Sequence, residues 1–540
     1  MNFNWQLSTA RLLTFSCAPF AIFLATAVGC AQAQSTSQPS QARAAVDVVE
    51  LTASSAAERM QAGTLTSHAL TQAYLDRIAA IDDDGPRLNA VIEINPEAIK
   101  QADALDAERK AGKVRGPLHG LPVLLKDNID VAGMVNSAGS LALADNRPKQ
   151  DAFIARRLRD AGAVILGKTN LSEWANFRST RSSSGWSSRG GQTKNPYVLD
   201  RNPCGSSSGT GSAISASLAV VGVGTETDGS IICPASVNGL VGLKPTVGLV
   251  SRTGIIPISV SQDTAGPMGR TVSDVAALLT ALAGVDPADP AGAAAEGHVA
   301  DYAVGLKTDA VKGKRFGVLR KAMGYHPDVD ASMDRAIAAL KAAGAEIVDA
   351  EIANDGRWGA PELEVLLYEF KDGLNAYLKN SGAPHASLEA LIAWNTANKE
   401  KAMPFFGQEL FEQAQAKGPL TDPAYIKAKA TARRLAGKDG LLATLDKDKL
   451  DAVIAPSVGP AWPTDHVLGD HFTGAGYGVA AVAGTPSLTV PIGDSQGLPL
   501  GVTFMSRPYT EADLLAWGYA FEQATKARKA PGFTPTLTEP

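Results

Sequence analysis

The sequence predicts an α/β fold built around a largely buried sheet, and two observations support this prediction. Past Gly116, short apolar runs such as LPVLLK, AVILGK, AVVGVG and DAVIAPS alternate with helix-like stretches such as DAFIARRLRDAG and VSDVAALLTALAG. Such alternation is typical of a sheet covered by helices. In addition, the chain has 540 residues, of which 45% are hydrophobic and 19% charged, so it can bury a large core as a soluble globular protein.

Residues 1–33 have the pattern of a secretory signal peptide. Arg11 precedes the apolar run LLTFSCAPFAIFLATAVGC, and Ala31 and Ala33 in the following AQAQS form a small-residue cleavage site. Residues 34–45 then form a polar linker. We therefore expect an exported protein that is periplasmic or secreted after cleavage of the signal peptide.

Two alternatives would keep this segment at a membrane. The apolar run is about as long as a short membrane span, so it could serve as an uncleaved anchor. A lipid on Cys30 is the second alternative, because AVGC weakly resembles a lipoprotein box. Membrane association is expected only through this segment or through such a lipid.

Residues 46–540 are predicted to form a single domain with one interruption. Between residues 46 and 82, apolar residues recur at three- and four-residue spacing, which predicts amphipathic helices. The region of about 285–445 is predicted to be a mostly helical excursion, because it is richer in charged and helix-forming residues. Its clearest helices are ELEVLLYEFKDGLNAYLK and SLEALIAWNTANKEKAM. A second strand-rich block follows, with LDAVIAPSVGPAWP and YGVAAVAGTPSLTVPIGDSQGLPLGVTFMS.

Charge and motifs argue against nucleic-acid and nucleotide partners. The formal net charge is −5 and no long basic run occurs, so a nucleic-acid partner has little electrostatic support. Residues 162–169, GAVILGKT, match the phosphate-binding pattern G-x-x-x-x-G-K-[ST]. However, the four residues between its glycines are themselves a predicted strand, whereas a phosphate site needs a loop of converging N–H groups. Lys168 is therefore predicted to end a strand, and a small-molecule substrate is expected.

Two glycine- and serine-rich turns contain candidate nucleophiles. GTETDGSIICPA presents Ser230, and CGSSSGTGSA presents Ser206. Glycines let a turn hold a serine in an unusual orientation. The second turn could also be a flexible linker, but it leads directly into the apolar AISASLAVVGVG, which predicts burial. A serine hydroxyl needs a base to take its proton, and no histidine is near either turn in the sequence.

Lys126 is the candidate base. It ends the apolar run of GPLHGLPVLLKDNID, and burial of a lysine lowers its pKa by disfavouring the ammonium form. Taken alone, a lysine there is more often a surface residue whose stem covers apolar groups. A Ser-His-Asp hydrolase is a further alternative, with His119 of PLHGLP as the one histidine close to a motif, although it is expected to pack rather than react.

Lys126, the 204–213 turn and Ser230 together resemble the amidase signature family, whose catalytic group is a Ser-Ser-Lys triad. GLPVLLKD matches the family pattern GxPxxxKD, GSSSG supplies Ser206, and Ser230 follows Ser206 by 24 residues, as in the family. GKTNLSEWA, VGLKPTVGLVS and AGTPSLTVP match further family stretches, so the resemblance spans about residues 46–530. It implies the amidase signature fold, with a mixed central β-sheet covered by α-helices on both faces.

The resemblance also implies a mechanism. Ser230 would attack the amide carbonyl and pass its proton to Ser206, which is hydrogen-bonded to neutral Lys126. A cis peptide bond would precede Ser206, and Ser207 would support the catalytic serines. The oxyanion hole is expected from the backbone N–H groups of Thr227, Asp228, Gly229 and Ser230. No metal and no organic cofactor is expected.

Two positions beside the nucleophile depart from the general family pattern GGSIR. Asp228 replaces a glycine and Ile232 replaces an arginine. This variant, together with KTNLSEWANFR and SRGGQT, resembles bacterial peptide amidases, which remove the C-terminal amide from peptides. A peptide-amide substrate is therefore implied. A broader aliphatic or aryl acylamidase is the main alternative.

Two more distant alternatives are a non-enzymatic amide-binding or scaffold protein and a component of an amidotransferase that acts on charged transfer RNA. The complete set of Lys126, Ser206 and Ser230 argues against the first of these. The exported N-terminus and the absence of a basic face argue against the second.

Two cysteines, Cys204 and Cys233, would remain after signal-peptide cleavage, in a compartment where disulfides persist. They flank Ser206 and Ser230 in the sequence, so they could be close if the two serines meet. A disulfide and two buried free thiols are both compatible with the sequence, while a metal site would need more ligands.

Overall fold

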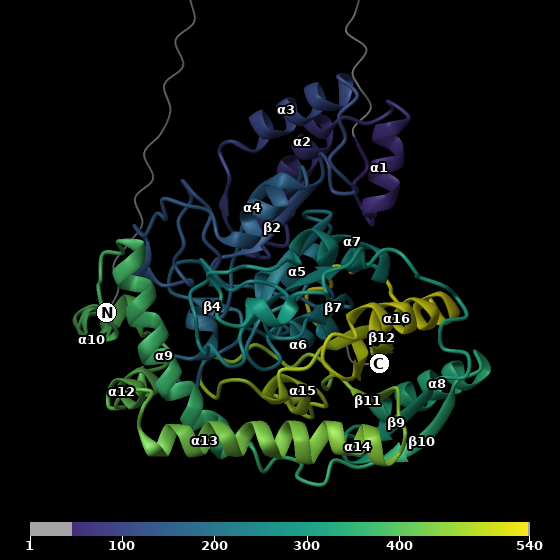
Figure 1. Cartoon of the computed structure of the whole chain (residues 1–540). Helices are drawn as coiled ribbons and strands as arrows, with labels where there is room; N and C mark the ends of the chain where they lie inside the picture. Colours follow the sequence, from purple (N-terminus) through teal and green to yellow (C-terminus); the bar gives the residue numbers. More distant parts are fainter. Residues whose placement is uncertain (1–45, 538–540) are drawn as a thin grey trace, which may run out of the picture. The chain divides into compact units, whose positions relative to one another are not determined.

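Eleven strands form one mixed sheet, and Figure 1 shows helices packed around it. The computed structural model describes residues 46–537, so the predicted signal peptide, linker and Cys30 lie outside the described residues. In sheet order the strands are β1 (Val91–Ile94), β3 (Val164–Thr169), β2 (Pro122–Lys126), β6 (Val221–Glu226), β8 (Thr264–Gly269), β7 (Val241–Lys244), β12 (Ser487–Ser495), β13 (Leu498–Met505), β11 (Ala452–Pro456), β9 (Arg315–Leu319) and β10 (Glu346–Ala350).

Helices flank this sheet, as the sequence predicted. They are α1 (Ala53–Gln61), α2 (Ser67–Ile78), α3 (Ala98–Lys110), α4 (Phe153–Asp160), α5 (Ser208–Ser215), α6 (Ile232–Val237), α7 (Val272–Leu282), α8 (Pro327–Ala342), α9 (Gly359–Ser381), α10 (Leu388–Ala397), α11 (Lys399–Ala402), α12 (Glu409–Gln415), α13 (Pro423–Arg433), α14 (Leu442–Lys447), α15 (Gly478–Ala483) and α16 (Glu511–Thr525). Within residues 46–537, no helix combines the length and apolar character needed to cross a membrane.

The direction of the central strands places the candidate site. Strand β2 runs parallel to both β3 and β6, so the carboxyl ends of β2 and β6 lie at the same edge of the sheet. Lys126 is the last residue of β2, and the turn that carries Ser230 follows β6. Ligands of α/β proteins usually bind at the carboxyl ends of such strands.

The predicted strands form because their apolar residues are covered on both sides. All five residues of β2 and all six of β6 are buried, which explains why the sequence shows continuous apolar runs instead of alternation. The helices begin at good capping residues where the sequence offers them. For example, the Thr66 side chain accepts the Ala69 N–H at the start of α2.

The excursion contains more than helices. Helices α8 to α14 lie within or at the end of the region predicted as mostly helical, and α13 packs against α9 (Figure 1, green). Two strands of the same region, β9 and β10, pair in parallel and extend the main sheet through β11. The sequence pattern does not predict these strands, because they flank α8 in a region whose overall composition is charged and helix-forming.

Candidate active site

Lys126 is a fully buried amine with three oxygen neighbours. Its Nζ lies 2.7 Å from Ser206 Oγ, 2.9 Å from Thr225 Oγ1 and 3.2 Å from the Thr225 carbonyl oxygen. Burial lowers the pKa of Lys126 to about 7, while the nearby Glu226 and Asp263 carboxylates limit the shift. The expectation that the apolar run would carry this lysine inward is therefore confirmed.

Thr225 is a neighbour of Lys126 that sequence reasoning missed. It lies near the end of β6, beside the parallel strand that carries the lysine. Its Oγ1 also accepts a hydrogen bond from Asn128 Nδ2 at 3.0 Å, so its side chain is held in place on the opposite side. Thr225 thus fixes the position of the lysine amine, and only the pairing of β2 with β6 could have shown it.

The Ser206 turn contacts the Ser230 turn directly. The Gly205–Ser206 peptide bond is cis, as the resemblance implied. The Ser207 N–H donates to the Ser230 carbonyl at 3.1 Å, and Ser207 Oγ donates to the Thr225 carbonyl at 3.1 Å. Gly205 cannot carry a side chain here, because a Cβ would lie 2.1 Å from Ser172 Oγ.

The structure therefore brings Lys126, Ser206, Ser207 and Ser230 together. Lys126, Ser206 and Ser207 have no exposed surface, whereas 8% of Ser230 is exposed. Ser230 also lines a cavity of about 260 Å³, with Thr227, Asp228 and the aromatic residues Phe177, Trp462, Phe472 and Tyr477. Of the four residues, Ser230 is the one that a ligand in this cavity can reach.

A buried carboxylate, Glu226, shapes the turn around Ser230. It accepts hydrogen bonds from the N–H groups of Gly229 at 2.8 Å, Ile231 at 2.7 Å and Ile232 at 3.0 Å. Burial raises the pKa of Glu226, and Lys244 and these three donors oppose that shift. Sequence reasoning missed this residue, although TETDG contains it.

Glu226 therefore occupies one of the four backbone N–H groups that were predicted to bind the oxyanion and leaves the other three free. The Gly229 N–H donates to Glu226, and Gly229 has a φ of +77°, a conformation that favours glycine. The N–H groups of Thr227, Asp228 and Ser230 have no hydrogen-bond partner in the part of the chain that the structure describes. Three of the four predicted donors are therefore available.

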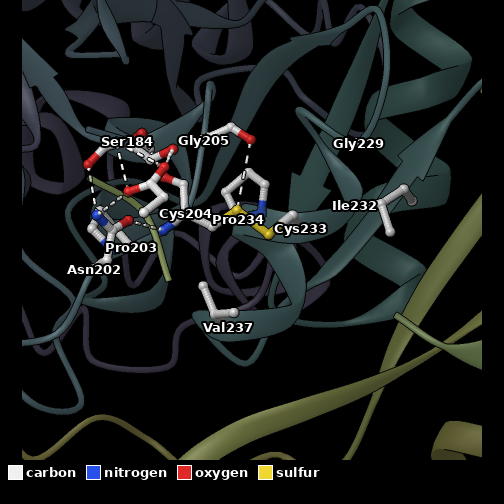
Figure 2. The surroundings of a disulfide bond; sticks show 12 residues. Ser184, Asn202, Pro203, Cys204, Gly205, Gly229, Ile232, Cys233, Pro234 and Val237 are labelled. Atoms are coloured by element: carbon white, nitrogen blue, oxygen red, sulfur yellow. Dashed lines mark hydrogen bonds between the residues drawn. A yellow bond between two sulfur atoms is a disulfide. The ribbon is translucent and has the colours of Figure 1, made fainter. Parts of the chain in front are cut away.

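A disulfide joins the two serine turns. Cys204 and Cys233 are bonded at an S–S distance of 2.00 Å, so the structure selects the disulfide over two free thiols (Figure 2). The Cys204 N–H also donates to Asn202 Oδ1 at 2.8 Å. The bond links a position two residues before Ser206 to helix α6, three residues after Ser230.

Replacing both cysteines with serine is expected to lower both stability and kcat. The disulfide bridges a separation of 29 residues, and closing a loop of this size stabilises a protein by about 2–4 kcal/mol. Differential scanning calorimetry should show a lower Tm, and amide hydrolysis should show a lower kcat because the Ser206 and Ser230 turns lose a covalent connection. Wild-type Tm and kcat in the double variant would contradict this role.

His119 and the GAVILGKT stretch, which suggested other functions, both have structural roles. His119 is buried, its Nε2 lies 3.0 Å from the Leu105 carbonyl, and its Nδ1 accepts the Arg115 N–H at 3.3 Å. It packs, as expected, and does not contact either serine turn. Lys168 lies in β3 and forms a buried ion pair with Asp127 at 3.2 Å, so the GAVILGKT stretch is a strand and not a phosphate-binding loop.

Comparison with known proteins places the chain in a family. The amidase family model matches residues 69–515. A crystal structure of a peptide amidase in complex with the competitive inhibitor chymostatin is 55% identical, with a TM-score of 0.88, and the match covers 89% of this chain and 99% of that one. The native peptide amidase from Stenotrophomonas maltophilia is also 55% identical, with a TM-score of 0.87 and coverages of 90% and 99%.

A plant relative agrees with these structures. A probable amidase of Arabidopsis thaliana is 41% identical over 486 residues, which covers 87% of this chain and 89% of the relative. The resemblance noted from the sequence motifs is thus confirmed over most of the chain. This protein therefore belongs to the amidase family of hydrolases that act on amide C–N bonds.

Proposed function

We propose that this amidase removes the terminal carboxamide of peptide amides, producing the free acid and ammonia. The observation that carries the proposal is the 2.7 Å contact between the buried Lys126 amine and Ser206 Oγ, next to a Ser230 that faces the cavity. The 55% identity to peptide amidases supports the choice of substrate. A broader aliphatic or aryl acylamidase is the other outcome that the substrate test below distinguishes.

The contacts of Lys126 suit a neutral amine that accepts a proton. A neutral amine has two N–H donors and one lone pair. The two donors match the Thr225 carbonyl and Oγ1, which lie 3.2 and 2.9 Å away. The lone pair is then directed at the Ser206 hydroxyl. Because burial lowers the pKa of Lys126 to about 7, a large fraction of the amine is neutral at physiological pH.

The proposed reaction proceeds through an acyl-enzyme. Ser230 Oγ attacks the carbonyl carbon, its proton moves to Ser206, and the Ser206 proton moves to Lys126 Nζ. The developing oxyanion accepts hydrogen bonds from the free N–H groups of Thr227, Asp228 and Ser230. The C–N bond then breaks, and ammonia leaves with a proton returned through Ser206. Water attacks the ester by the same relay and releases the acid.

Glu226 is proposed to position this oxyanion hole. By holding the N–H groups of Gly229, Ile231 and Ile232, it fixes the backbone on both sides of Ser230. The remaining amides are then oriented before the substrate arrives, which is the arrangement that lowers the cost of stabilising the oxyanion.

We further propose that the protein acts outside the cytoplasm. The signal-peptide pattern of residues 1–33 is the basis for this proposal. The Cys204–Cys233 disulfide supports it, because such bonds persist mainly in oxidising compartments.

A substrate panel tests the proposed function. Wild-type enzyme is expected to release ammonia from C-terminally amidated peptides with little cleavage of internal peptide bonds, because the leaving-group side of the site would accommodate only a small group. Ammonia assay and mass spectrometry of the acid product would be run beside an anilide and a short aliphatic amide. A much higher kcat/KM for the anilide or the aliphatic amide than for every peptide amide would leave only the general amidase activity.

A further inference from the structure

The Ser230 cavity adjoins a second, larger cavity. The second cavity has a volume of about 490 Å³ and shares Asp228, Phe472 and Tyr477 with the first. Tyr325 and Trp358 are among its other lining residues. A substrate whose carboxamide lies at Ser230 therefore has room for the rest of its chain beyond Asp228.

Asp228 presents a carboxylate at the junction of these cavities. The residue is exposed at this junction, and its Oδ1 lies beside Gly478 at the start of α15, 3.7 Å from where a Cβ would be. Desolvation by the surrounding protein, followed by the Glu362 and Glu226 carboxyl groups, raises the pKa of Asp228 well above its ordinary value, and Lys244 opposes this shift. Between residues 46 and 537, no lysine or arginine forms an ion pair with it. Lys321 is the one lysine or arginine among the described lining residues of the two cavities, and it already pairs with Glu351.

A second carboxyl group, Glu362 of α9, lies close to the same turn. Gln262 Nε2 donates to Glu362 Oε1 at 2.8 Å and lies 3.4 Å from the carbonyl oxygen of Thr227, the residue before Asp228. Glu362 is 7% exposed, and burial raises its pKa to about 7. In the described part of the chain it too forms no ion pair, so two carboxyl groups without a directly bound cation lie near this turn.

Tyr477 provides an independent sign of a polar ligand. Its side chain is 8% exposed and lines both cavities. The hydroxyl lies against Gly229, 2.4 Å from where a Cβ of residue 229 would be. Burial, followed by the Asp228 and Glu226 carboxylates, raises the pKa of Tyr477, so the hydroxyl stays protonated. This hydroxyl has no hydrogen-bond partner among residues 46–537, and because Tyr477 lines both cavities, it is free to bind a polar group of a ligand there.

We propose that Asp228 and Tyr477 bind the free α-ammonium group of a short peptide amide, with Glu362 as a second carboxyl group close to Asp228 but outside the lining of the cavities. This inference rests on the proposed peptide-amidase function and adds a preference for peptide amides whose N-terminus is unblocked. An ammonium group supplies the cationic partner that the two carboxyl groups lack, and it carries three N–H donors for the acceptors that Asp228 and Tyr477 present to the same cavities. Asp228 stands where the general family pattern has glycine, so this charge is a property of the variant turn.

The test compares matched substrates that differ only in the N-terminal charge. Dipeptide and tripeptide amides would each be prepared with a free and an acetylated N-terminus, and assayed at pH 7, where an α-ammonium of pKa about 7.7–8.0 is mostly protonated. Wild-type enzyme is expected to show a kcat/KM about tenfold higher for the free form of at least one length. In Asp228→Asn, the ratio of free to acetylated kcat/KM is expected to fall to about one.

Two further variants test whether the effect is specific to the carboxyl groups near the cavities. Glu362→Gln is expected to lower the same ratio, and it replaces the first variant if Asp228→Asn does not fold. Glu364→Gln is the matched control, because Glu364 lies two residues further along α9 and pairs with Lys417 outside both cavities; it should leave the wild-type ratio unchanged.

The outcomes separate this inference from the proposed function. Peptide amides hydrolysed by the wild type with a ratio near one at both lengths would overturn the ammonium site alone. The same holds if the ratio stays at its wild-type value in both Asp228→Asn and Glu362→Gln. If the wild type hydrolyses no peptide amide at all, the proposed function and the ammonium site both fail.

Discussion

Replacing Ser230 with alanine is expected to abolish amide hydrolysis and leave the fold intact. Loss of the nucleophile in a coupled catalytic unit lowers kcat by a factor on the order of 10⁴ to 10⁶. Stability should change little, because the Ser230 side chain is small and borders the cavity. Its carbonyl, which accepts the Ser207 N–H, is unaffected by the change. Single-turnover assays and thermal unfolding of the purified variant measure the two effects separately.

Ser236→Ala is a suitable control for this experiment. Ser236 lies in α6, close to Ser230 in the sequence, and is also buried. Its hydroxyl has no hydrogen-bond partner in the described residues, so its loss removes a similar group without a catalytic contact. The control should retain wild-type kcat. Activity of Ser230→Ala above about a hundredth of the wild-type value would refute the nucleophile assignment.

The sequence was most informative where burial alone determined the structure. LPVLLK predicted strand β2 from its apolar run alone, whereas the inward position of Lys126 became the expectation only together with the Ser206 and Ser230 turns, because a lysine at the end of such a run is more often a surface residue. The same reasoning placed AVILGK in β3 and excluded a phosphate loop. In both strands, burial of apolar side chains explains the sequence pattern as well as the position of the strand in the sheet.

Contacts that depend on how distant segments meet were not predictable in this way. Thr225 contacts Lys126 because β2 and β6 are neighbours in the sheet, and nothing in either segment alone specifies that pairing. From their spacing in the sequence, Cys204 and Cys233 could form a disulfide or remain free thiols. Their positions in the fold show that they form a disulfide.

In the turn before Ser230, too, the sequence did not predict which groups form hydrogen bonds. TETDG predicted four free N–H groups, but the Gly229 N–H donates to Glu226 in the structure. A buried glutamate that accepts three main-chain N–H groups could not be distinguished in the sequence from an acidic residue on an exposed turn. The sequence therefore predicted which segment would supply an oxyanion hole, but not that Glu226 holds the backbone of this segment.

Replacing Lys126 with arginine is expected to be almost as damaging as loss of the nucleophile. The guanidinium group stays protonated at any pH that the protein tolerates, so it cannot accept a proton from Ser206. A fall in kcat of about 10⁴ is expected for a member of a coupled catalytic unit. The buried positive charge should also lower the Tm, because the amine it replaces has no exposed surface and a pKa of about 7.

The pH profile and a neutral variant distinguish loss of the base from loss of structure. In the wild type, kcat/KM should rise with pH through a midpoint near 7, because burial lowers the pKa of Lys126 to about 7 and only the neutral amine has a free lone pair. Lys126→Met keeps most of the volume without a charge, so it should fold well and yet be nearly inactive, with no rise through this range. Wild-type turnover and an unchanged pH profile in Lys126→Arg would exclude Lys126 as the base, since a permanently charged group could not then be carrying the proton.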